Sequence, residues 1–466
     1  MDYADVVIAG GGPAGVATAA ALAQAGYTVL IVDAGADRTK QLAGELLHPP
    51  GVADLEALGF GQAVASIEAR PVKGFAVIDG VGTHEDGAQT QLLPYSELPG
   101  PSGQGIAFDH AKLCEALLAE VERRPRVKLW NKSRVTGIVQ NDAESVVVVV
   151  QRKDGSSTQV SAKLLVAADG RASGVRKMAG IEEDKKLLSS MAGYLVDSAL
   201  LPHPGFGHVF VGGRAPVLAY EIAPGTARVM VDIPEGGQGI DAPKKDPSYL
   251  AALPPALREA VQTVVHTHRA VVAASFTRKP QFAAKGRVAL VGDAAGCCHP
   301  VSASGLSSCT RDALELRRAL QESPDDIHQA LSRYSVWRKG PQRTRISLAA
   351  ALYQAFSENS PEMNFLRRGL FRYWRRSKAG RRTSMALLST REMRVGVMAR
   401  EYARVVSFAL PRLMVDSSKS WSALQNGRRA LTGLVRSTLP HVGETVRQAI
   451  DTLGRRRRSE SGSKSV

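Results

Sequence analysis

The first fifty residues alternate short apolar runs with glycine-rich turns, and this pattern predicts a strand, a helix and a second strand. The apolar run at 5–9 predicts a buried strand, the alanine-rich stretch at 16–25 a helix, and the run at 27–32 a second strand. The sequence GGGPAG at 10–15 joins the first strand to the helix, and Asp33 ends the second strand. A GxGxxG turn in this setting predicts a dinucleotide-binding site.

The residues of this turn have separate physical roles. Gly10 allows the tight turn, Gly12 lets a pyrophosphate approach the backbone, and Gly15 lets the helix pack closely on the strand. The N-terminus of the helix supplies free N–H groups and the positive end of its dipole to the phosphates. Asp33 lies 18 residues after Gly15, where it can accept hydrogen bonds from ribose hydroxyl groups.

Two later segments distinguish FAD from NAD as the dinucleotide. The sequence KLLVAADGRASGVR at 163–176 predicts a strand that runs into an Asp-Gly pair. The sequence RVALVGDA at 287–294 predicts a strand that ends in Gly-Asp, and a helix is predicted over 306–320. Asp293 can bind the ribityl chain of a flavin, and the N-terminus of the following helix can face the isoalloxazine ring. NAD dehydrogenases do not need this third segment, so the sequence predicts FAD.

The three motifs, in this order, resemble those of flavoprotein monooxygenases of the para-hydroxybenzoate hydroxylase type. In that family the Gly-Asp segment binds FAD, and the reduced flavin activates oxygen. Within the family, the chain is similar to the squalene epoxidases (squalene monooxygenases) from about residue 5 to about residue 400. The segments that carry this similarity include GELLHPPG at 44–51, AFDHAKL at 107–113, PVLAYEI at 216–222, HPVSASGL at 299–306 and ALYQAFS at 351–357.

The motifs and the resemblance together give a set of expected FAD-binding residues. They are Gly10, Gly12, Pro13, Ala14, Gly15, Asp33, Ala34, Leu46, Lys112, Asp293, Pro300, Gly305 and Leu306. The resemblance also implies that a C4a-hydroperoxyflavin delivers oxygen to an alkene. For this chemistry the protein has to position the substrate and exclude water, and it needs no general base. No catalytic side chain is therefore assigned from the sequence.

Several positions depart from the squalene epoxidase pattern. Gln41 stands where the family has an arginine, for which the neighbouring Lys40 is a substitute. His48 stands where the family has a glutamine, and Phe75 where it has a tyrosine. Those two polar residues are thought to lie near the reacting end of squalene, so His48 and Phe75 are candidate residues of the substrate pocket. His48 has a second interpretation, as a hydrogen-bonded loop residue beside two prolines.

These departures leave two substrates open. The first is a long lipophilic isoprenoid such as squalene, which would be epoxidised. The alternative is a prenylated aromatic of the quinolone or indole type, modified by chain epoxidation or ring hydroxylation. In both cases the expected electron source is NADH or NADPH, acting directly or through a reductase, and molecular oxygen is the other substrate. A non-catalytic flavin- or lipid-binding protein is an interpretation from a different class.

Composition adds limits on the compartment and on metal chemistry. Of the 466 residues, 44% are hydrophobic and 22% charged, which is typical of globular proteins. The four cysteines have no CxxC spacing, so a disulfide scaffold is excluded and a reducing compartment is favoured. The start MDYADVVIAGGG lacks a signal-peptide pattern, and no metal-ligand cluster is found. We expect a cytoplasmic protein without a bound metal.

The charge is concentrated in the C-terminal third. Residues 331–466 hold 28 of the 60 basic residues but only 8 of the 44 acidic ones. The stretch 362–376 is amphipathic at helical spacing, and 405–414 is apolar between arginines. One interpretation is peripheral membrane association, with the apolar faces in the lipid and the arginines at the headgroups. The other is a helical subdomain that covers the flavin domain. No nucleic-acid-binding motif is present, so no such partner is expected.

We therefore expect an α/β (α+β) protein with a Rossmann-type FAD domain, an inserted β-sheet substrate domain and a helical, membrane-facing C-terminal region. The FAD domain is expected to comprise 1–69, 105–179 and 276–340, and the substrate domain 70–104 and 180–275. A basic helical region is expected at 341–453, followed by a disordered tail at 454–466.

Overall fold

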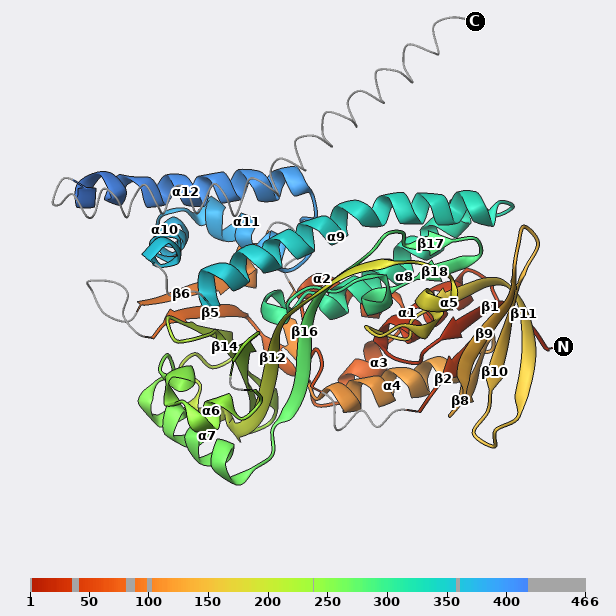
Figure 1. The fold of residues 1–466 in the computed structure, drawn as a ribbon, viewed down its shortest axis with the longest axis horizontal. Helices are drawn as coiled ribbons and strands as arrows, with labels where there is room; N and C mark the ends of the chain where they lie inside the picture. Colours follow the sequence, from red (N-terminus) through yellow and green to blue (C-terminus); the bar gives the residue numbers. More distant parts are fainter. Residues whose placement is uncertain are drawn as a thin grey trace, which may run out of the picture.

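Two large β-sheets and a layer of C-terminal helices make up the protein (Figure 1). The structure is a computed structural model, and it describes residues 2–35, 42–80, 89–98, 103–237, 239–357 and 361–417. The predictions for Lys40, Gln41 and the tail at 454–466 lie outside the described residues.

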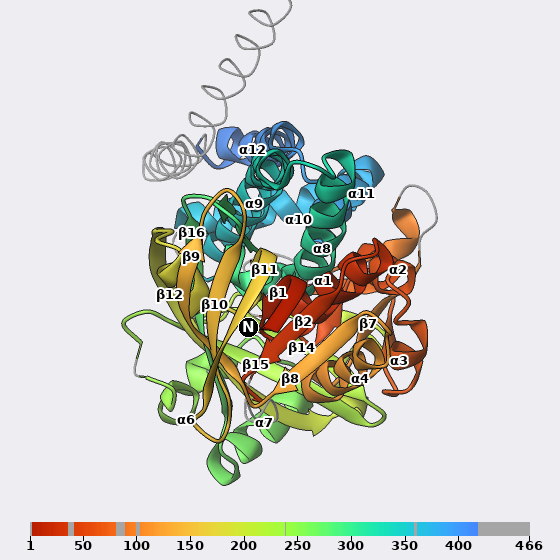
Figure 2. The same cartoon turned by 90° about the vertical axis from the view of Figure 1, so that its right-hand side faces the viewer.

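An eight-stranded sheet carries the dinucleotide motifs. Its parallel part consists, in spatial order, of β18 (Val288–Leu290), β11 (Ser157–Ala167), β1 (Asp2–Ala9), β2 (Val29–Asp33) and β8 (Val127–Asn131). Three antiparallel strands complete it: β17 (Ala284–Lys285) beside β18, then β10 (Val146–Gln151) beside β11 and β9 (Arg134–Asn141) beside β10 (Figure 2).

Both faces of this sheet are buried. Three helices cover one face: α1 (Pro13–Gln24), α4 (His110–Glu122) and α8 (Gly305–Glu322). Val6 and Ile8 of β1 pack with these helices, whereas Val7 packs on the other face with β10. This alternation follows from the two-residue period of a strand. The strands and helices predicted from the sequence around the glycine turn and around Asp293 are all present, with ends shifted by a few residues.

A seven-stranded sheet forms the second layer. Its strands, in spatial order, are β16 (Val271–Pro280), β12 (Glu183–Asp197), β15 (Thr226–Pro234), β14 (Val217–Ala223), β13 (Gly207–Val211), β5 (Gly74–Asp79) and β6 (Gln89–Pro94). All neighbours are antiparallel except β13 and β5. Helices α6 (Ala242–Lys245) and α7 (Pro255–Thr267) pack on one face.

Short elements connect the two layers. A small sheet combines β3 (Leu46–Leu47), β7 (Gly105–Ala107) and β4 (Arg70–Val72), in that order. The short α-helices are α2 (Pro49–Ala57), α3 (Gly61–Ala65) and α5 (Gly174–Met178). The 3₁₀ turns are η2 (Tyr95–Glu97), η3 (Ser198–Leu200), η4 (Pro247–Leu250), η5 (Gly292–Ala295) and η6 (Pro300–Ser302).

The C-terminal helices form a further layer (Figure 1). They are α9 (Ile327–Ser357), α10 (Pro361–Arg376), α11 (Lys378–Leu388) and α12 (Val395–Ser417). Helix α9 extends over both sheets, and α10 to α12 lie on the side of the seven-stranded sheet. The first half of α9 packs with the FAD-motif sheet through Leu331 and Tyr334, and its second half packs with the seven-stranded sheet through Leu352 and Phe356. One continuous helix thus connects the two cores.

The expectation that the apolar face of 362–376 enters a membrane is wrong. That face is buried inside the protein and packs with residues of the seven-stranded sheet and of α9. The buried residues of the face are Met363, Leu366, Leu370, Tyr373 and Trp374. Arg367 of the same helix forms a fully buried ion pair with Asp79 of β5 at 3.6 Å. An amphipathic pattern shows that one face leaves water, and here the apolar surface that it meets belongs to this chain.

Within the described ranges, no helix has both the length and the apolar content needed to cross a bilayer.

Candidate FAD and substrate site

A cavity of about 690 Å³ lies between the two large sheets. Its wall combines the turns that follow β1, β2, β11 and β18 with one face of the seven-stranded sheet. Most of the predicted site residues share this wall: Gly10, Gly12, Pro13, Ala14, Asp33, Ala34, Leu46, Phe75, Asp293, Pro300, Gly305 and Leu306. They converge because the carboxyl ends of parallel strands meet at one edge of a sheet.

Helix α1 begins at the cavity with uncapped N–H groups. No side chain caps it, and its first turn contains no acidic residue. A Cβ on Gly12 would meet no atom within 4 Å, so the space in front of the helix is open. By contrast, a Cβ on Gly10 would clash with the carbonyl of Ala168, and a Cβ on Gly15 with the carbonyl of Gly10. Gly15 therefore acts in helix packing and does not line the cavity.

Asp33 holds the glycine turn from the end of β2. Its Oδ1 accepts a hydrogen bond from the N–H of Gly11 at 2.9 Å, and its Oδ2 accepts one from the N–H of Gly35 at 3.2 Å. The carboxylate also lines the cavity. Asp33, which the sequence predicts to bind a ribose, thus orients the glycine turn.

Helix α8 presents a second uncapped N-terminus to the same cavity. Ser304 is its N-cap residue but makes no side-chain cap, and the first turn is free of acidic residues. A Cβ on Gly305 would meet open space. Ala303, which precedes the N-cap residue Ser304, has a φ of +49°. This left-handed conformation costs a residue with a Cβ roughly 1–2 kcal/mol. The turn between η6 and α8 thus has a left-handed residue at a position that favours glycine, although alanine occupies it.

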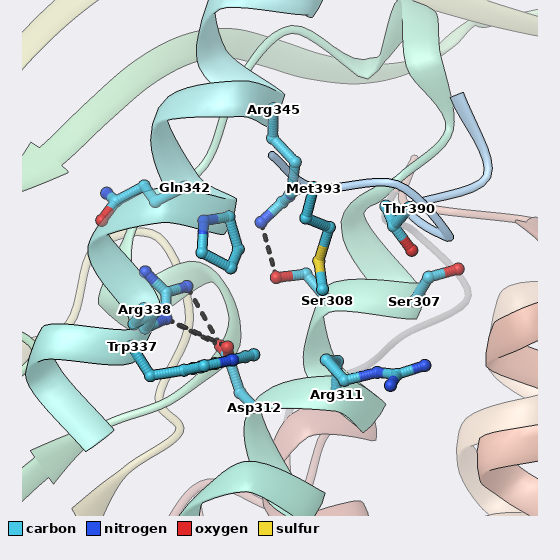
Figure 3. A pocket seen from close by; sticks show the side chains of 11 residues that line it. Ser307, Ser308, Arg311, Asp312, Trp337, Arg338, Gln342, Arg345, Thr390 and Met393 are labelled. Atoms are coloured by element: carbon cyan, nitrogen blue, oxygen red, sulfur yellow. Dashed lines mark hydrogen bonds and ion pairs between the residues drawn. The ribbon is translucent and has the colours of Figure 1, made fainter. Parts of the chain in front are cut away.

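A buried ion pair holds the turn between β18 and α8 (Figure 3). Nε of Arg338, on α9, lies 3.0 Å from Oδ2 of Asp312, on α8, and both side chains are almost fully buried. Asp312 accepts the N–H of Gly292 at 2.8 Å, and Arg338 donates to the carbonyls of Gly292 and Ala295. Together these bonds fix the turn that carries Asp293.

Two of the predicted motifs also contact each other. Nε of Arg171, in the segment that follows β11, lies 3.7 Å from Oδ2 of Asp293, and both residues line the cavity. Asp169 accepts hydrogen bonds from the hydroxyl of Ser173 at 2.5 Å and the N–H of Val175 at 3.0 Å, which fixes the start of α5. Arg171 thus extends from an ordered turn toward the Gly-Asp motif.

A buried hydrogen-bond cluster supports the loop before α8. The N–H of Val301 donates to Nδ1 of His299, so Nε2 of His299 carries its proton and donates to Oδ1 of Asp232 at 3.1 Å. The Asp232 carboxylate also accepts the hydroxyls of Ser189 at 2.5 Å and Tyr353 at 2.9 Å. Three hydrogen-bond donors therefore meet at the buried Asp232 side chain and join the seven-stranded sheet, the loop and α9.

His48 is not part of the cavity wall, contrary to its proposed place in the substrate pocket. It is fully buried behind Phe75, with ring centroids 5.7 Å apart. Its Nε2 donates to the carbonyl of Ser302 at 2.9 Å, and its Nδ1 accepts the hydroxyl of Tyr95 at 2.7 Å. Burial lowers the pKa of His48 to about 4, so the ring is neutral. Both nitrogens are occupied, as in the loop-residue interpretation.

Lys112 also lies away from the cavity, on the exposed side of α4. His110 of the same helix lines the cavity instead, and its Nδ1 donates to the carbonyl of Gly44 at 2.9 Å. The two residues are two positions apart on a helix, so their side chains point to different sides. A match of sequence segments does not resolve which side faces the cofactor.

The part of the cavity on the seven-stranded sheet is mainly apolar. It is lined there by Phe75, Met191, His208, Leu218, Tyr220, Met230, Ala273, Ser275 and Phe276. The polar atoms of His208 are engaged: Nδ1 donates to the carbonyl of Ala219 at 3.3 Å, and Nε2 accepts the N–H of His203 at 3.1 Å. Burial lowers the pKa of His208 to about 4. The hydroxyl of Tyr220 donates to the sulfur of Met230.

One ion pair closes the wall between the two layers. Glu45, before β3, accepts two hydrogen bonds from Nε of Arg228 on β15 and a third from its terminal nitrogen at 2.9 Å. Burial raises the pKa of Glu45, while the bonds from Arg228 oppose that rise. Glu45 lines the cavity, so this pair ties the turn before Leu46 to the substrate-side sheet.

These features fit FAD. The volume is in the range of roughly 300–1,000 Å³ typical of ligand cavities, and two uncapped helix N-termini offer N–H donors to anionic groups at separate points of the wall. Asp33 and Asp293 are placed to accept hydroxyl groups. The fold and the cavity define a dinucleotide-binding flavoprotein.

Comparison with known proteins agrees with this class. The family model described as "FAD binding domain" matches residues 3–335, and the chain belongs to this family. The prediction of FAD as cofactor is thereby confirmed.

Curated relatives confirm the resemblance to squalene epoxidases. The chain is 29% identical over 388 residues to squalene monooxygenase of Mus musculus, covering 80% of this chain and 65% of that protein. It is 29% identical over 390 residues to squalene epoxidase erg1 of Aspergillus fumigatus, covering 80% and 79%. The chain thus spans just under two thirds of the length of the mouse relative.

Solved structures share the fold. The p-nitrophenol 4-monooxygenase PnpA from Pseudomonas putida superposes with a TM-score of 0.71 at 20% identity, over 84% of this chain and 99% of that one. The flavin-dependent brominase Bmp2 superposes with a TM-score of 0.69 at 16% identity, over 89% and 100%.

The glycine turn yields a contrast between two substitutions. Gly12→Val adds a side chain in open space at an ordinary φ of −76°, so the fold should persist while the pyrophosphate loses its place. We expect FAD affinity to fall by at least about 100-fold, which is roughly 2.7 kcal/mol. Gly15→Ala should instead lower the unfolding midpoint of the apoprotein. Flavin absorbance after gel filtration and urea denaturation measure the two effects; equal FAD retention in Gly12→Val and wild type would contradict the assignment.

The buried histidines predict a pH dependence of stability. His48 and His208 have folded pKa values of about 4 against about 6.5 in the unfolded chain, so the unfolded state gains protons first as the pH falls. The free energy of unfolding should be flat above pH 6.5 and decrease toward pH 4, by roughly 2 kcal/mol per histidine at pH 5. Urea denaturation at several pH values tests this. His48→Gln should remove about half of the slope, and an unchanged slope would refute the neutral ring.

Proposed function

We propose that the chain is an FAD-dependent monooxygenase that epoxidises a long lipophilic isoprenoid such as squalene. The observation that carries the proposal is a single cavity with two chemically different parts. One part has the donors expected for FAD, and the other is a mainly apolar sheet face, on which the side chains of His208 and Tyr220 are bonded within the protein. The squalene monooxygenase and squalene epoxidase relatives support the same substrate class.

The residues of the chain would divide the task in a simple way. The N-termini of α1 and α8, with Asp33 and Asp293, would hold FAD, which supplies oxygen activation when bound and reduced. The side chains of Phe75, Leu218 and Met230 would position the alkene and exclude water. Epoxidation needs no general base, in agreement with the neutral, fully bonded His48.

We further propose that the seven-stranded sheet is an inserted substrate domain formed by 70–104 and 180–275. In support, β5 and β6 of the first segment continue the sheet beside β13 of the second segment, and the cavity face of this sheet is mainly apolar. Strand β16 continues to Pro280, so the second segment extends a few residues further than the sequence suggested. The FAD domain would comprise 1–69, 105–179 and a third segment that begins after Pro280 and not at the expected residue 276.

A prenylated quinolone or indole is less well supported as substrate. Such a ring brings polar N–H and carbonyl groups into the site, and these need partners when they are buried. The imidazole of His208 and the hydroxyl of Tyr220, on the substrate-side wall, already have partners. A linear hydrocarbon has no polar groups and therefore needs no hydrogen-bond partners in the site.

The decisive experiment offers squalene and a prenylated quinolone to FAD-loaded protein in detergent, with NAD(P)H and with or without a generic reductase. We expect a +16 Da product from squalene by mass spectrometry. Met230→Glu places a carboxylate in the apolar wall and should lower kcat/KM at least about 100-fold. Met230→Leu, which conserves volume, should stay within a few fold. Oxygenation of the quinolone alone would overturn the squalene proposal.

We also propose that the protein associates peripherally with membranes through charge. The helical layer carries exposed cations on α10 to α12, including Arg375, Arg376, Lys378, Arg391 and Arg400. Because the apolar face of α10 is buried, binding would depend on anionic headgroups and be weakened by salt.

Vesicle co-sedimentation tests this surface. The full chain should bind vesicles that contain anionic lipid and should bind neutral ones weakly. Arg375→Glu combined with Arg376→Glu should reduce the binding to anionic vesicles at least about 30-fold, because about 1 kcal/mol is available per basic residue near the surface. Equal binding to neutral and anionic vesicles would contradict a charge-driven contact.

A further inference from the structure

We propose that Arg345 holds an uncompensated positive charge against the flavin end of the cavity and thereby favours reduction of the bound FAD. This inference rests on the FAD-binding part of the proposed function and is independent of the identity of the lipophilic substrate. Arg345 belongs to no sequence motif and comes from α9, outside the segments that carry the dinucleotide motifs.

The side chains that Arg345 contacts by hydrogen bonds are polar but neutral. Its side chain is 8% exposed and forms part of the cavity wall. Nε donates to the hydroxyl of Ser304 at 3.3 Å, and one terminal nitrogen donates to the hydroxyl of Ser308 at 2.5 Å (Figure 3). Ser304 is the N-cap of α8 and Ser308 lies in its first turns, so the guanidinium sits against the beginning of this helix.

Nearby charges do not neutralise it. In the part of the chain that the structure describes, Arg345 forms no ion pair with a carboxylate. Its neighbour Arg338 is paired with Asp312, and Asp293 faces Arg171. The positive charge of Arg345 is thus left over after the local pairs are formed. An unpaired buried charge is costly, which points to an anion that completes the site.

Of the two cavities that Arg345 borders among the described residues, the larger one has room for that anion. On its other side Arg345 borders a small cavity of about 10 Å³, which it shares with Arg338, Gln342, Thr390 and others (Figure 3). This volume is enough for about one water molecule. The countercharge therefore has to come from the side of Gly305 and Leu306, where the flavin ring is expected.

The chemistry of flavin supplies such an anion on reduction. A hydride from a nicotinamide carries two electrons and one proton, oxidises the nicotinamide to its cation and leaves the flavin with one additional negative charge. The N-terminus of α8 already offers about half a positive charge to this position, and Arg345 adds a full one. Oxidised flavin is neutral in its ring, so the added charge stabilises the reduced form selectively.

The test measures the bound flavin without turnover. Arg345→Gln removes the charge but keeps hydrogen-bond donors toward Ser304 and Ser308. We expect the midpoint potential of FAD to become more negative, corresponding to at least a tenfold loss in the reduction equilibrium, about 30 mV for two electrons. The affinity for sulfite, whose adduct also places negative charge on the flavin ring, should fall by a similar factor. Arg345→Lys should retain most of both properties.

A matched control lies on the same helix. Arg343 is two residues away, so it points to a different side of α9, and it does not line the cavity. Arg343→Gln should leave both quantities within twofold. Ser308→Asp keeps Arg345 but places a carboxylate beside it, and should shift both quantities in the same direction as Arg345→Gln.

The outcomes separate this inference from the proposed function. If wild type binds FAD and Arg345→Gln leaves the potential and the sulfite affinity within twofold, the role of Arg345 is refuted. If Arg345→Gln fails to retain FAD, the same two quantities are measured on Ser308→Asp, and values within twofold of wild type refute the role of Arg345. If the wild-type chain itself binds no FAD, the proposed monooxygenase fails as well.

Discussion

The turn from Gly292 to Ala295 has to keep one conformation although it lies in irregular structure at a cavity wall, and a buried ion pair imposes that conformation. Asp312 accepts the N–H of Gly292, while Arg338 donates to the carbonyls of Gly292 and Ala295. Burying two charges costs several kcal/mol per ion, so such a pair adds little to overall stability. Its effect is geometric, because it satisfies backbone groups that only this turn presents together. The position of Asp293 and the start of α8 both follow from it.

Other side chains of α9 also hold irregular segments of the cavity wall by hydrogen bonds. Arg338, Arg345 and Tyr353 are spaced by seven and eight residues, so they share one side of the helix. They reach, in turn, the Gly-Asp turn, the N-terminus of α8 and the Asp232 carboxylate beneath His299. The helix packs with the FAD-motif sheet at one end and with the seven-stranded sheet at the other. It also runs through residue 340, where the sequence suggested that the FAD domain ends. Part of the region assigned to a membrane contact thus supports the flavin site.

Local patterns explain why the nucleotide-binding half could be predicted and much of the rest could not. The glycine turn, Asp33 and the Gly-Asp motif are short segments whose roles depend on their immediate neighbours, and the cavity contains them. The Glu45–Arg228 pair joins residues 183 positions apart, and no spacing rule links them. Arg345 is one arginine among many in a basic region. The amphipathic pattern of 362–376 identified the buried face correctly but could not show whether protein or lipid would cover it. Resemblance singled out position 48, yet its place behind Phe75 depends on Tyr95 and Ser302.

The two ends of the cavity differ in polarity, and Phe75 lies in the wall of the mainly apolar end. At the end that carries the dinucleotide motifs, the N-termini of α1 and α8 have no side-chain cap, and Arg345 is hydrogen-bonded to two serine hydroxyls. At the sheet end, the side chains of His208 and Tyr220 already have hydrogen-bond partners within the protein. Phe75 lines the wall and packs edge-on against Tyr95 and at a tilt against His48, which is hydrogen-bonded to Tyr95 and to the loop before α8. A change at position 48 would therefore alter the packing of Phe75 in the cavity wall. The two positions depart from the family pattern together and are adjacent in space, although they are 27 residues apart in sequence.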